Sequence, residues 1–201
     1  MPNVANQMEI PDGELFYFPN FLPSDKADDY NKYFIENIHW ETGTIKIFGK
    51  EHNIPRKQAY FADPNKSYSY SGKTLHIQQW DEHLLEIKNT VSDFCQHKFN
   101  ACLMNLYENG SHSNGWHADN EKELGKNPVI ASVSLGEKRT FQLKHNHTKK
   151  RIDLPLEHGS LLLMQGTLQH HWKHCLPKRK NVEHARVNLT FRNIVIDLKE
   201  T

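Results

Sequence analysis

The chain has 201 residues, which is enough for one domain with a substantial buried core. Its 25 basic and 24 acidic residues give a formal net charge of +1, so a nucleic-acid partner would have to be recognised by local basic patches. Three cysteines without CxxC spacing argue against a disulfide framework or a zinc ribbon, and no apolar run approaches the roughly 18 residues of a membrane span.

The first 14 residues predict a loose tail, because they show no periodic pattern. They also lack the basic start and apolar stretch of a secretory signal. We therefore expect an intracellular protein, cytoplasmic in a bacterium or nuclear in a eukaryote. Pro23-Ser24-Asp25 then predicts the start of a helix with Ser24 or Asp25 as N-cap, and apolar residues recur at helical spacing as far as Ile38.

The next segment predicts a hairpin, an irregular stretch and a second helix. Residues 42–50 carry β-branched side chains between glycines, with a hairpin tip near Phe48-Gly49. Residues 55–72 are rich in Tyr and predict irregular structure. A helix is expected over residues 80–99. Its apolar side chains fall on one stripe: Leu84, Ile87, Val91, Phe94 and Cys95.

After residue 100 the pattern changes to short strands separated by turn signals. We expect strands at 101–107, 129–135, 140–143, 151–154, 160–164, 169–174 and 186–196. Short strands at such spacing are typical of a sandwich or jelly roll. The predicted fold class is α+β, mainly β, with N-terminal helices and a lid in residues 1–100 packed on a double-sheet core in residues 101–201, as a single compact domain overall.

A metal motif is predicted at His117-Ala118-Asp119, where the imidazole and the carboxylate point to the same face of an extended backbone. One distant histidine would complete the two-histidine, one-carboxylate set that holds Fe(II) and leaves open positions. A His-x-Asp tripeptide is common by chance, so alone it predicts a surface loop more often than a ligand pair. A distant histidine and the arginine-containing strand further along the chain make a ligand pair the better interpretation.

Three histidines compete to be the third ligand: His170, His171 and His174. On an extended strand His170 and His174 share one face and both are geometrically possible, whereas His171 points away. We choose His174, because it heads the turn that leads toward the arginine-containing strand. For the remaining candidates we expect exposed or loop positions: His112, His145, His147, His158 and His184.

The strand at 186–192, Arg-Val-Asn-Leu-Thr-Phe-Arg, alternates polar and apolar side chains with period two. Its polar face would ordinarily be solvated. In a barrel it can face the lumen instead, where a guanidinium binds a carboxylate through two parallel hydrogen bonds. Asn105 and Tyr107 share one face of an earlier strand and offer hydrogen bonds to a second carboxylate. With the metal motif, this strand predicts an iron-dependent oxygenase that uses a dicarboxylate.

Several motifs occur together: Asn105-Leu106-Tyr107, His117-x-Asp119, Ile-Ala-Ser-Val-Ser-Leu-Gly at 130–136, His-Gly-Ser-Leu at 158–161, His174-x-Leu176-Pro177 and the strand at 186–192. Taken together they resemble the AlkB family of Fe(II)/2-oxoglutarate dioxygenases, the alkylated-nucleobase demethylases, over roughly residues 42–194. The Arg-x-Asn-x-Thr-Phe-Arg signature is the most specific of them. The resemblance implies a double-stranded β-helix, or jelly roll, which agrees with the strand prediction.

The resemblance also implies the iron ligands, which are His117, Asp119 and His174. It implies 2-oxoglutarate contacts from Asn105, Tyr107, Arg186, Asn188, Thr190 and Arg192. By the family pattern Arg192 meets the distal carboxylate, while Arg186 lies nearer the metal. The implied cofactors are Fe(II), 2-oxoglutarate and O2, with ascorbate as a reductant in vitro.

The N-terminal part looks most like the branch that repairs double-stranded DNA, through Phe-Gly-Lys at 48–50, Pro-Arg-Lys-Gln at 55–58 and Tyr-Ser-Tyr-Ser-Gly at 68–72. This likeness implies a nucleotide-recognition hairpin or lid, in which Phe48 fills the gap left by a flipped base and Tyr70 stacks on that base. The implied substrate contacts are Phe48, Arg56, Tyr68, Tyr70 and Glu121. The branch commonly has Phe where Tyr70 stands and an acidic residue where Asn120 stands.

Two basic clusters suit a polyanionic partner. The first is Lys144, Lys149, Lys150 and Arg151, and the second is Lys173, Lys178, Arg179 and Lys180. Phosphate contacts are assigned to Lys178, Arg179 and Lys180. The predicted function is oxidative demethylation of N-alkylated bases, such as 1-methyladenine and 3-methylcytosine, in DNA, as direct-reversal repair with base flipping.

The expected partner is alkylated DNA, double-stranded in the first place, with single-stranded DNA or RNA as alternatives; we expect a monomer without a membrane partner. Two other functions stay open. One is a 2-oxoglutarate oxygenase acting on RNA or another substrate, and the other is a non-catalytic nucleic-acid-binding jelly roll. The intact ligand set and the two arginines argue against the second, because such a module has no use for a dicarboxylate.

Overall fold

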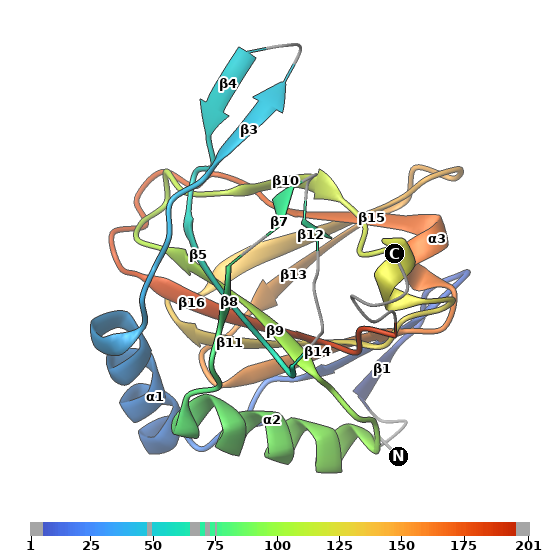
Figure 1. Cartoon of the computed structure of the whole chain (residues 1–201). Helices are drawn as coiled ribbons and strands as arrows, with labels where there is room; N and C mark the ends of the chain where they lie inside the picture. Colours follow the sequence, from blue (N-terminus) through green and yellow to red (C-terminus); the bar gives the residue numbers. More distant parts are fainter. Residues whose placement is uncertain (1–5, 48–49, 65–68, 71–72, 75, 196–201) are drawn as a thin grey trace.

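The computed structural model describes residues 6–47, 50–64, 69–70, 73–74 and 76–195. Two facing sheets form the body (Figure 1). The large sheet has the strand order β1 (Gln7–Met8), β2 (Glu14–Phe18), β14 (Ser160–Gln165), β11 (Ile130–Gly136), β16 (Arg186–Arg192), β9 (Ala101–Tyr107), β5 (Lys57–Ala62), β8 (Ile77–Gln78). The small sheet has the order β10 (Asn114–His117), β15 (Trp172–Leu176), β12 (Arg139–His145), β13 (Arg151–Leu156).

Two hairpins and a few helical segments complete the described chain. The hairpins are β3 (Thr44–Ile47) with β4 (Lys50–Asn53) and β6 (Ser69–Tyr70) with β7 (Lys73–Thr74). The helices are α1 (Ser24–Asn37), α2 (Glu82–Cys95) and the single turn α3 (Leu168–His171), with a 3-10 turn at Lys122–Leu124. Among the described residues, none of the helices combines the length and apolar character that crossing a bilayer requires.

Helices α1 and α2 cover the outer face of the large sheet, on the side away from the small sheet (Figure 1). Their buried side chains, such as Phe34 and Ile87, join the outward-facing side chains of β16 in one core. A second core lies between the two sheets and includes Leu103 and Trp172. The central strands of the large sheet are buried along their whole length, because the helices cover one face and the small sheet covers the other.

The strands of residues 1–100 and 101–201 share one sheet. β2 pairs with β14, and β5 pairs with β9, so the large sheet crosses the expected division at residue 100. The expected loose tail is wrong from Gln7 onward, because β1 and β2 extend the sheet. The expected irregular stretch is wrong at β5, a strand that is almost fully buried. It lacks the period-two alternation of a half-buried strand because both of its faces are covered.

The segment expected as a strand at 169–174 begins as the helical turn α3 and becomes β15 only at Trp172. A turn allows the adjacent side chains of Leu168 and Gln169 both to point inward, which a strand does not. His170 is consequently exposed and bonds Asn127 at 2.9 Å, so it does not share a face with His174.

The two long helices begin differently from their predicted starts. Pro23 occupies the cap position of α1, and no side chain caps that helix, so the expected N-cap at Ser24 or Asp25 is wrong. In α2 the Asp81 carboxylate accepts hydrogen bonds from two backbone N–H groups of the first turn, at 3.0 and 3.2 Å. Phe94 of the predicted stripe keeps 39% of its surface exposed, while its ring packs edge-on against Phe18.

Candidate active site

The space between the two sheets contains a cavity where the predicted metal motif meets the polar face of β16. The ligand atoms of His117, Asp119 and His174 lie within 4.8 Å of one another. His117 ends β10, and it pairs across the small sheet with His174 of β15, which brings the two rings to 4.2 Å between centroids. A two-histidine, one-carboxylate set of this kind suits Fe(II).

The two histidines are oriented as ligands. His117 Nδ1 lies 2.7 Å from the carbonyl oxygen of Gly115, to which it donates as the protonated nitrogen, so Nε2 carries the lone pair. This Nε2 lies 4.0 Å from Asp119 Oδ1 and 3.3 Å from Asn114 Nδ2. His174 is 3% exposed, and its Nδ1 has no hydrogen-bond partner among the described residues. A buried ring nitrogen without a partner fits a group that binds a metal. Burial lowers the pKa of His117 and lowers that of His174 to about 3, so both rings are neutral near pH 7.

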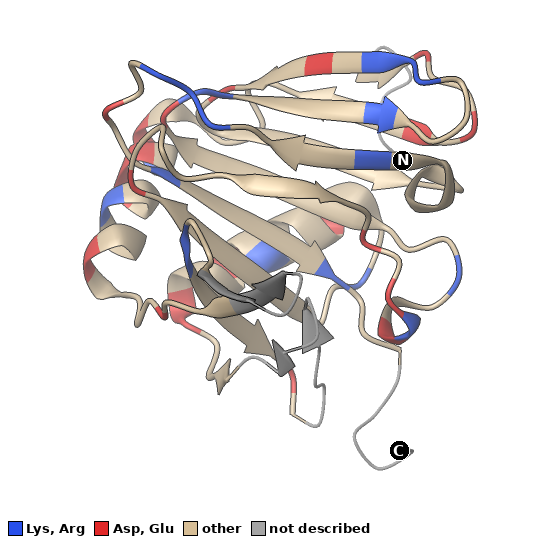
Figure 2. Cartoon of the chain, turned by 90° about the horizontal axis from the view of Figure 1, so that it is seen from above, with Lys and Arg blue, Asp and Glu red and all other residues tan. Residues whose placement is uncertain are grey.

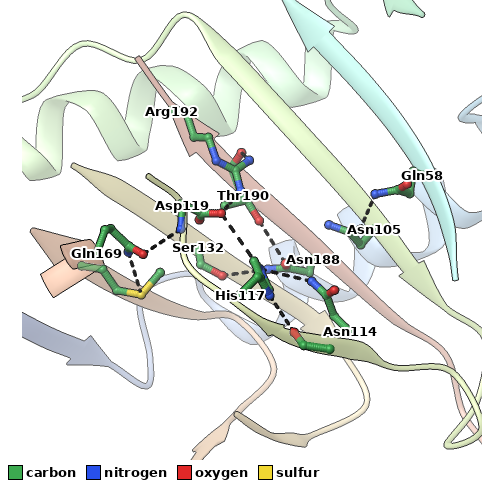
Figure 3. A network of polar contacts seen from close by, with 12 residues as sticks. Gln58, Asn105, Asn114, His117, Asp119, Ser132, Gln169, Asn188, Thr190 and Arg192 are labelled. Atoms are coloured by element: carbon green, nitrogen blue, oxygen red, sulfur yellow. Dashed lines mark hydrogen bonds and ion pairs between the residues drawn. The ribbon is translucent and has the colours of Figure 1, made fainter. Parts of the chain in front are cut away.

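Asp119 is a buried carboxylate held in its ionised form. Burial raises its pKa, but nearby Arg192, followed by the two histidines, outweighs burial and lowers the pKa to about 2. Arg192 Nη2 lies 3.0 Å from Asp119 Oδ1. The backbone N–H of Asp119 donates to Gln169 Oε1 at 2.9 Å, which fixes the main chain behind the carboxylate (Figure 3).

The two arginines of β16 lie at opposite ends of the cavity. Arg192 contacts Asp119, whereas Arg186 donates to Ser134 Oγ at 2.8 Å and lies 5.5 Å from the centre of the Tyr107 ring. The expectation that Arg186 is nearer the metal is therefore wrong, and Arg192 takes that position. The reason is the pairing of β16 with β9, which places Arg186 opposite Tyr107 and leaves Arg192 at the far end of the strand.

Arg186 is a buried cation without a carboxylate partner among the described residues, and its Nε has no acceptor there. Burial lowers its pKa to about 10, so the guanidinium still carries its charge near neutral pH. A buried, charged and incompletely bonded guanidinium is costly unless an anion joins it. This end of the cavity therefore suits the remote carboxylate of a dicarboxylate.

Asn105 lies between the two ends and has a fixed amide orientation. Its Oδ1 accepts hydrogen bonds from Arg56 Nε at 2.7 Å and from Gln58 Nε2 at 3.2 Å. Both donors are buried; Gln58 lies in β5, and Arg56 directly precedes that strand. Because the oxygen is used twice, the Asn105 amide nitrogen is the group left to donate into the cavity.

Asn188 and Thr190 form a small network on the floor of the cavity (Figure 3). Asn188 Nδ2 donates to Ser132 Oγ at 2.8 Å, and Thr190 Oγ1 donates to Asn188 Oδ1 at 3.1 Å. The polar face of β16 thus looks into the cavity, while its apolar face packs under the helices. All nine residues expected to hold the metal or 2-oxoglutarate line this one cavity.

The residues expected to contact the substrate are described only in part. Phe48 and Tyr68 lie outside the described residues, and of Tyr70 only the backbone is described, in the strand paired with β7. Arg56 is buried, with its guanidinium on Asn105 and on the carbonyl of Ser113. Glu121 is half-buried and immediately precedes the 3-10 turn. Their roles toward a base stay predictions.

The residues expected to contact phosphate lie in the loop that follows β15. Lys178, Arg179 and Lys180 are all exposed, and the N–H of Arg179 donates to the carbonyl of Gly110 at 2.8 Å. Arg139, which is buried, donates to three carbonyl groups of the same neighbourhood, those of Asn109, His112 and Pro177. The loop is exposed at its side chains but anchored at its backbone.

Several residues of the site were not found from the sequence. Gln169 carries no motif of its own, since a Gln in a predicted strand is ordinarily solvated. Gln58 ends the matched motif at 55–58 but was given no role there. Ser132 lies within the matched segment 130–136, and its alternation with Ala131 and Val133 was the available signal. Asn114, whose Nδ2 is 3.3 Å from His117 Nε2, precedes the motif by three residues.

A second cluster, Asp12, His145 and His171, brings ligand atoms within 4.8 Å of one another. His145 is 2% exposed, so its expected exposed or loop position is wrong. Its Nδ1 accepts from the N–H groups of His147 and Thr148, and therefore Nε2 carries the proton and donates to Asp12 at 3.1 Å. That nitrogen has no lone pair for a metal, so we interpret this cluster as a hydrogen-bonded anchor of the N-terminal segment.

Comparison with known proteins supports the same reading. The family model described as the 2OG-Fe(II) oxygenase superfamily matches residues 14–192. The human protein named DNA oxidative demethylase ALKBH2 is 38% identical over 185 residues, which cover 87% of this chain and 71% of that protein. The human alpha-ketoglutarate-dependent dioxygenase alkB homolog 3 is 33% identical over 190 residues, which cover 90% of this chain and 66% of that protein.

Two solved structures confirm the jelly-roll fold. The structure of OsALKBH1 has a TM-score of 0.65 at 20% identity, covering 93% of this chain and 100% of that one. A Pseudomonas putida prolyl-4-hydroxylase has a TM-score of 0.58 at 14% identity, covering 89% of this chain and 92% of that one. At these identities the likeness concerns the fold alone.

Proposed function

Since this chain belongs to the 2OG-Fe(II) oxygenase superfamily, as an AlkB-type member, we propose that it removes alkyl groups from N-alkylated DNA bases, such as 1-methyladenine and 3-methylcytosine, by oxidation. It is a dioxygenase, and its cofactors are Fe(II), 2-oxoglutarate and O2. One observation carries the proposal: a two-histidine, one-carboxylate group, in which Asp119 and His174 are buried, lies in the same cavity as two buried arginines.

In this proposal His117, Asp119 and His174 hold the iron. Bound Fe(II), with 2-oxoglutarate and O2, supplies the oxidant that hydroxylates the N-methyl group, and the hydroxymethyl product then releases formaldehyde. The low pKa values of Asp119 and His174, about 2 and about 3, keep the carboxylate charged and the ring neutral, which are the forms that bind a metal.

The remaining cavity residues orient the cosubstrate. Arg186 binds the carboxylate remote from the metal, with Tyr107 beside it, because this guanidinium lacks an anionic partner among the described residues. Arg192 faces the end nearer the metal, where it neutralises Asp119. Between the two ends, the Asn105 amide nitrogen donates into the cavity. Asn188 and Thr190 contribute the polar floor between them.

The base must leave its stack to reach this cavity, because the metal group lies between two sheets with Asp119 and His174 buried. In our proposal Phe48 fills the gap in a double-stranded substrate, Tyr68 and Tyr70 stack on or hydrogen-bond the flipped base, and the polar side chain of Glu121 contacts its edge. Phe48→Ala should then impair duplex substrates more than single strands. Equal loss on both would contradict the wedge.

The exposed loop of Lys178, Arg179 and Lys180 is proposed to hold the phosphate backbone. Its anchored main chain supports this role, because fixed cations lose less freedom when they bind. Replacing all three by Gln should weaken DNA binding. The difference in affinity from the wild-type protein should become smaller as salt is added, since counterion release sets the salt dependence. We further propose that the protein acts as a monomer inside the cell.

Mass spectrometry of a duplex oligonucleotide with one 1-methyladenine tests the function. The protein is incubated with Fe(II), ascorbate, 2-oxoglutarate and air, beside a His174→Ala control. Loss of one CH2 mass with the wild-type protein alone is the expected result. Succinate without that loss would move the substrate elsewhere, for example to methylated RNA, which is run in parallel. Neither product would favour a non-catalytic nucleic-acid-binding module.

A further inference from the structure

The outer face of the small sheet has a hollow that plays no part in the site described above. Its lining consists of Trp116, Lys144, His145, Asn146, Lys149 and Lys173. Trp116 and Lys173 directly precede two of the metal-group histidines, His117 and His174, in β10 and β15. The histidines line the inner cavity, whereas Lys173 is exposed and Trp116 keeps 43% of its surface exposed.

Three cations lie in one row across this face. The strand register places Lys144 of β12 opposite Lys173 of β15 on one side and opposite Arg151 of β13 on the other. Figure 2 shows basic residues at the same end of these neighbouring strands. Like charges directly opposite each other destabilise a sheet. The arrangement therefore costs folding free energy unless an anion binds to it.

No internal anion compensates the row within the described part of the chain. The lining of the hollow has no Asp or Glu among the described residues. Asp153 on β13 accepts a hydrogen bond from Gln142 Nε2 at 3.0 Å, and within the described residues it forms no ion pair with the row. Asp12 accepts a hydrogen bond from His145. An external anion would thus complete the row.

The exposed indole adds an aromatic surface beside these cations. Among the described residues no aromatic ring packs on Trp116, in contrast to the exposed Phe94, which contacts two other rings. An aromatic face next to a cationic groove is the combination that binds single-stranded nucleic acid, in which the indole stacks on a base and the cations meet the phosphates.

We propose that this hollow binds one nucleotide of a single-stranded segment of the substrate, away from the damaged base. The indole of Trp116 stacks on the base, and Lys144 and Lys173 hold its phosphate. The inference rests on the proposed nucleic-acid substrate and deepens it. A base within a duplex already has neighbours on both faces, so the contact favours single strands over duplexes, opposite to the preference expected from Phe48.

Fluorescence anisotropy with unmodified oligonucleotides tests the stacking contact without any oxidation step. Trp116→Ala should raise the Kd for a labelled single strand at least about fivefold, the lower end of a base–aromatic stacking contribution. The Kd for a duplex of equal length should change less than about twofold. Trp116→Phe should retain most of the affinity, and Phe94→Leu, at an exposed aromatic on α2, serves as the matched control.

The lysines are tested by the salt dependence of the same binding. Lys144→Gln and Lys173→Gln should each reduce the slope of log Kd against log salt concentration by about 0.7 for a single strand. Lys98→Gln, at an exposed lysine beyond the end of α2, should leave the slope unchanged. Lys144→Gln should also keep or raise the melting temperature, because it removes repulsion from two neighbours.

Unchanged single-strand affinity in Trp116→Ala, or equal losses on single strand and duplex, would overturn the inference. So would unchanged salt slopes in the lysine variants. These outcomes are independent of the demethylation assay. If the wild-type protein demethylates DNA and Trp116→Ala binds single strands normally, the role of the hollow is rejected and the proposed function stands. If Trp116→Ala binds single strands more weakly but the wild-type protein shows no oxidation, the role of the hollow stands and the proposed function is rejected.

Discussion

The two faces of β16 are equally buried but chemically opposite. Val187, Leu189 and Phe191 are 0% exposed and pack under α1 and α2, while the side chains from Arg186 to Arg192 that alternate with them are 2–8% exposed and line the cavity. Burial on the helix side gains free energy from apolar contact. Burial on the cavity side costs free energy unless each polar group is bonded. The same strand thus contributes to folding stability through one face and to the cosubstrate site through the other. Substitutions on the two faces should therefore change different properties.

Breaking the ion pair on the cavity face should have the largest effect. Arg192→Met leaves Asp119 as a buried charge without its cation, which costs about 3–5 kcal/mol of unfolding free energy. The double variant Arg192→Met with Asp119→Leu should recover most of that stability in urea unfolding, because no buried charge is left. Neither variant should turn over 2-oxoglutarate. A double variant as unstable as the single one would contradict this account.

A substitution on the helix face should damage stability alone. Leu189→Ala removes a fully buried side chain from the core beneath the helices, with an expected loss of about 2–5 kcal/mol. Activity per folded molecule, measured below the unfolding temperature, should stay at the wild-type value. A fall in that specific activity larger than the unfolded fraction would show that the two faces are coupled.

Lowering the pH should reduce the free energy of unfolding through residues of the cavity face and not through those of the helix face. An unfolded histidine binds a proton near pH 6.5, whereas burial holds the pKa of His174 at about 3 and lowers that of His117. The unfolded chain therefore binds more protons below pH 6.5, and the metal-free protein loses stability as the pH falls, by about 1.4 kcal/mol per pH unit for each ring that stays neutral. Asp119, with a pKa of about 2 against 3.8 in its ordinary state, adds a loss below about pH 3.8.

Urea unfolding with a chelator present, repeated between pH 7 and 4, measures this slope. His174→Leu should give a shallower curve, because one neutral ring is removed. Leu189→Ala should give a curve displaced to lower stability but parallel to the wild type. A His174→Leu slope equal to that of the wild type would mean that the ring is not held neutral by burial.

The smallest effect is expected behind the cavity, at Gln58. Gln58→Leu removes one of the two donors to Asn105 Oδ1, a hydrogen bond that contributes about 0.5–1.5 kcal/mol. The KM for 2-oxoglutarate should rise by roughly two- to tenfold, with little change in kcat, since the Asn105 amide is less firmly oriented. The control is Lys57→Met, at the residue next to Gln58. It removes an exposed ion pair with Glu108 and should leave KM unchanged.

The alternation along 186–192 predicted both faces of β16, and it predicted them because period two is a local property of a strand. Which end lies near the metal was predicted wrongly, because that depends on the pairing of β16 with β9, residues far apart in sequence. The resemblance identified the nine cavity residues that the structure brings together. β5 escaped prediction because a strand covered on both faces shows no alternation.

The turn at Leu168–His171 shows a similar limit. A run of Gln and His has no apolar periodicity, so an extended strand and a helical turn fit it equally well. The choice is made by Gln169, which turns inward to bond the main chain of Asp119, a contact between residues fifty positions apart. Contacts at that separation leave no trace in the local pattern.

The strand that carries both arginines lies inside the large sheet, with β11 on one side and β9 on the other. The β3–β4 hairpin, by contrast, pairs only within itself among the described residues and projects from the body (Figure 1). Amide hydrogen exchange should therefore be slowest in β16, where opening requires unfolding of the whole sheet, and much faster in the hairpin strands. In the proposed function, this lets the hairpin rearrange around different nucleic-acid shapes many times during the lifetime of one intact cosubstrate site.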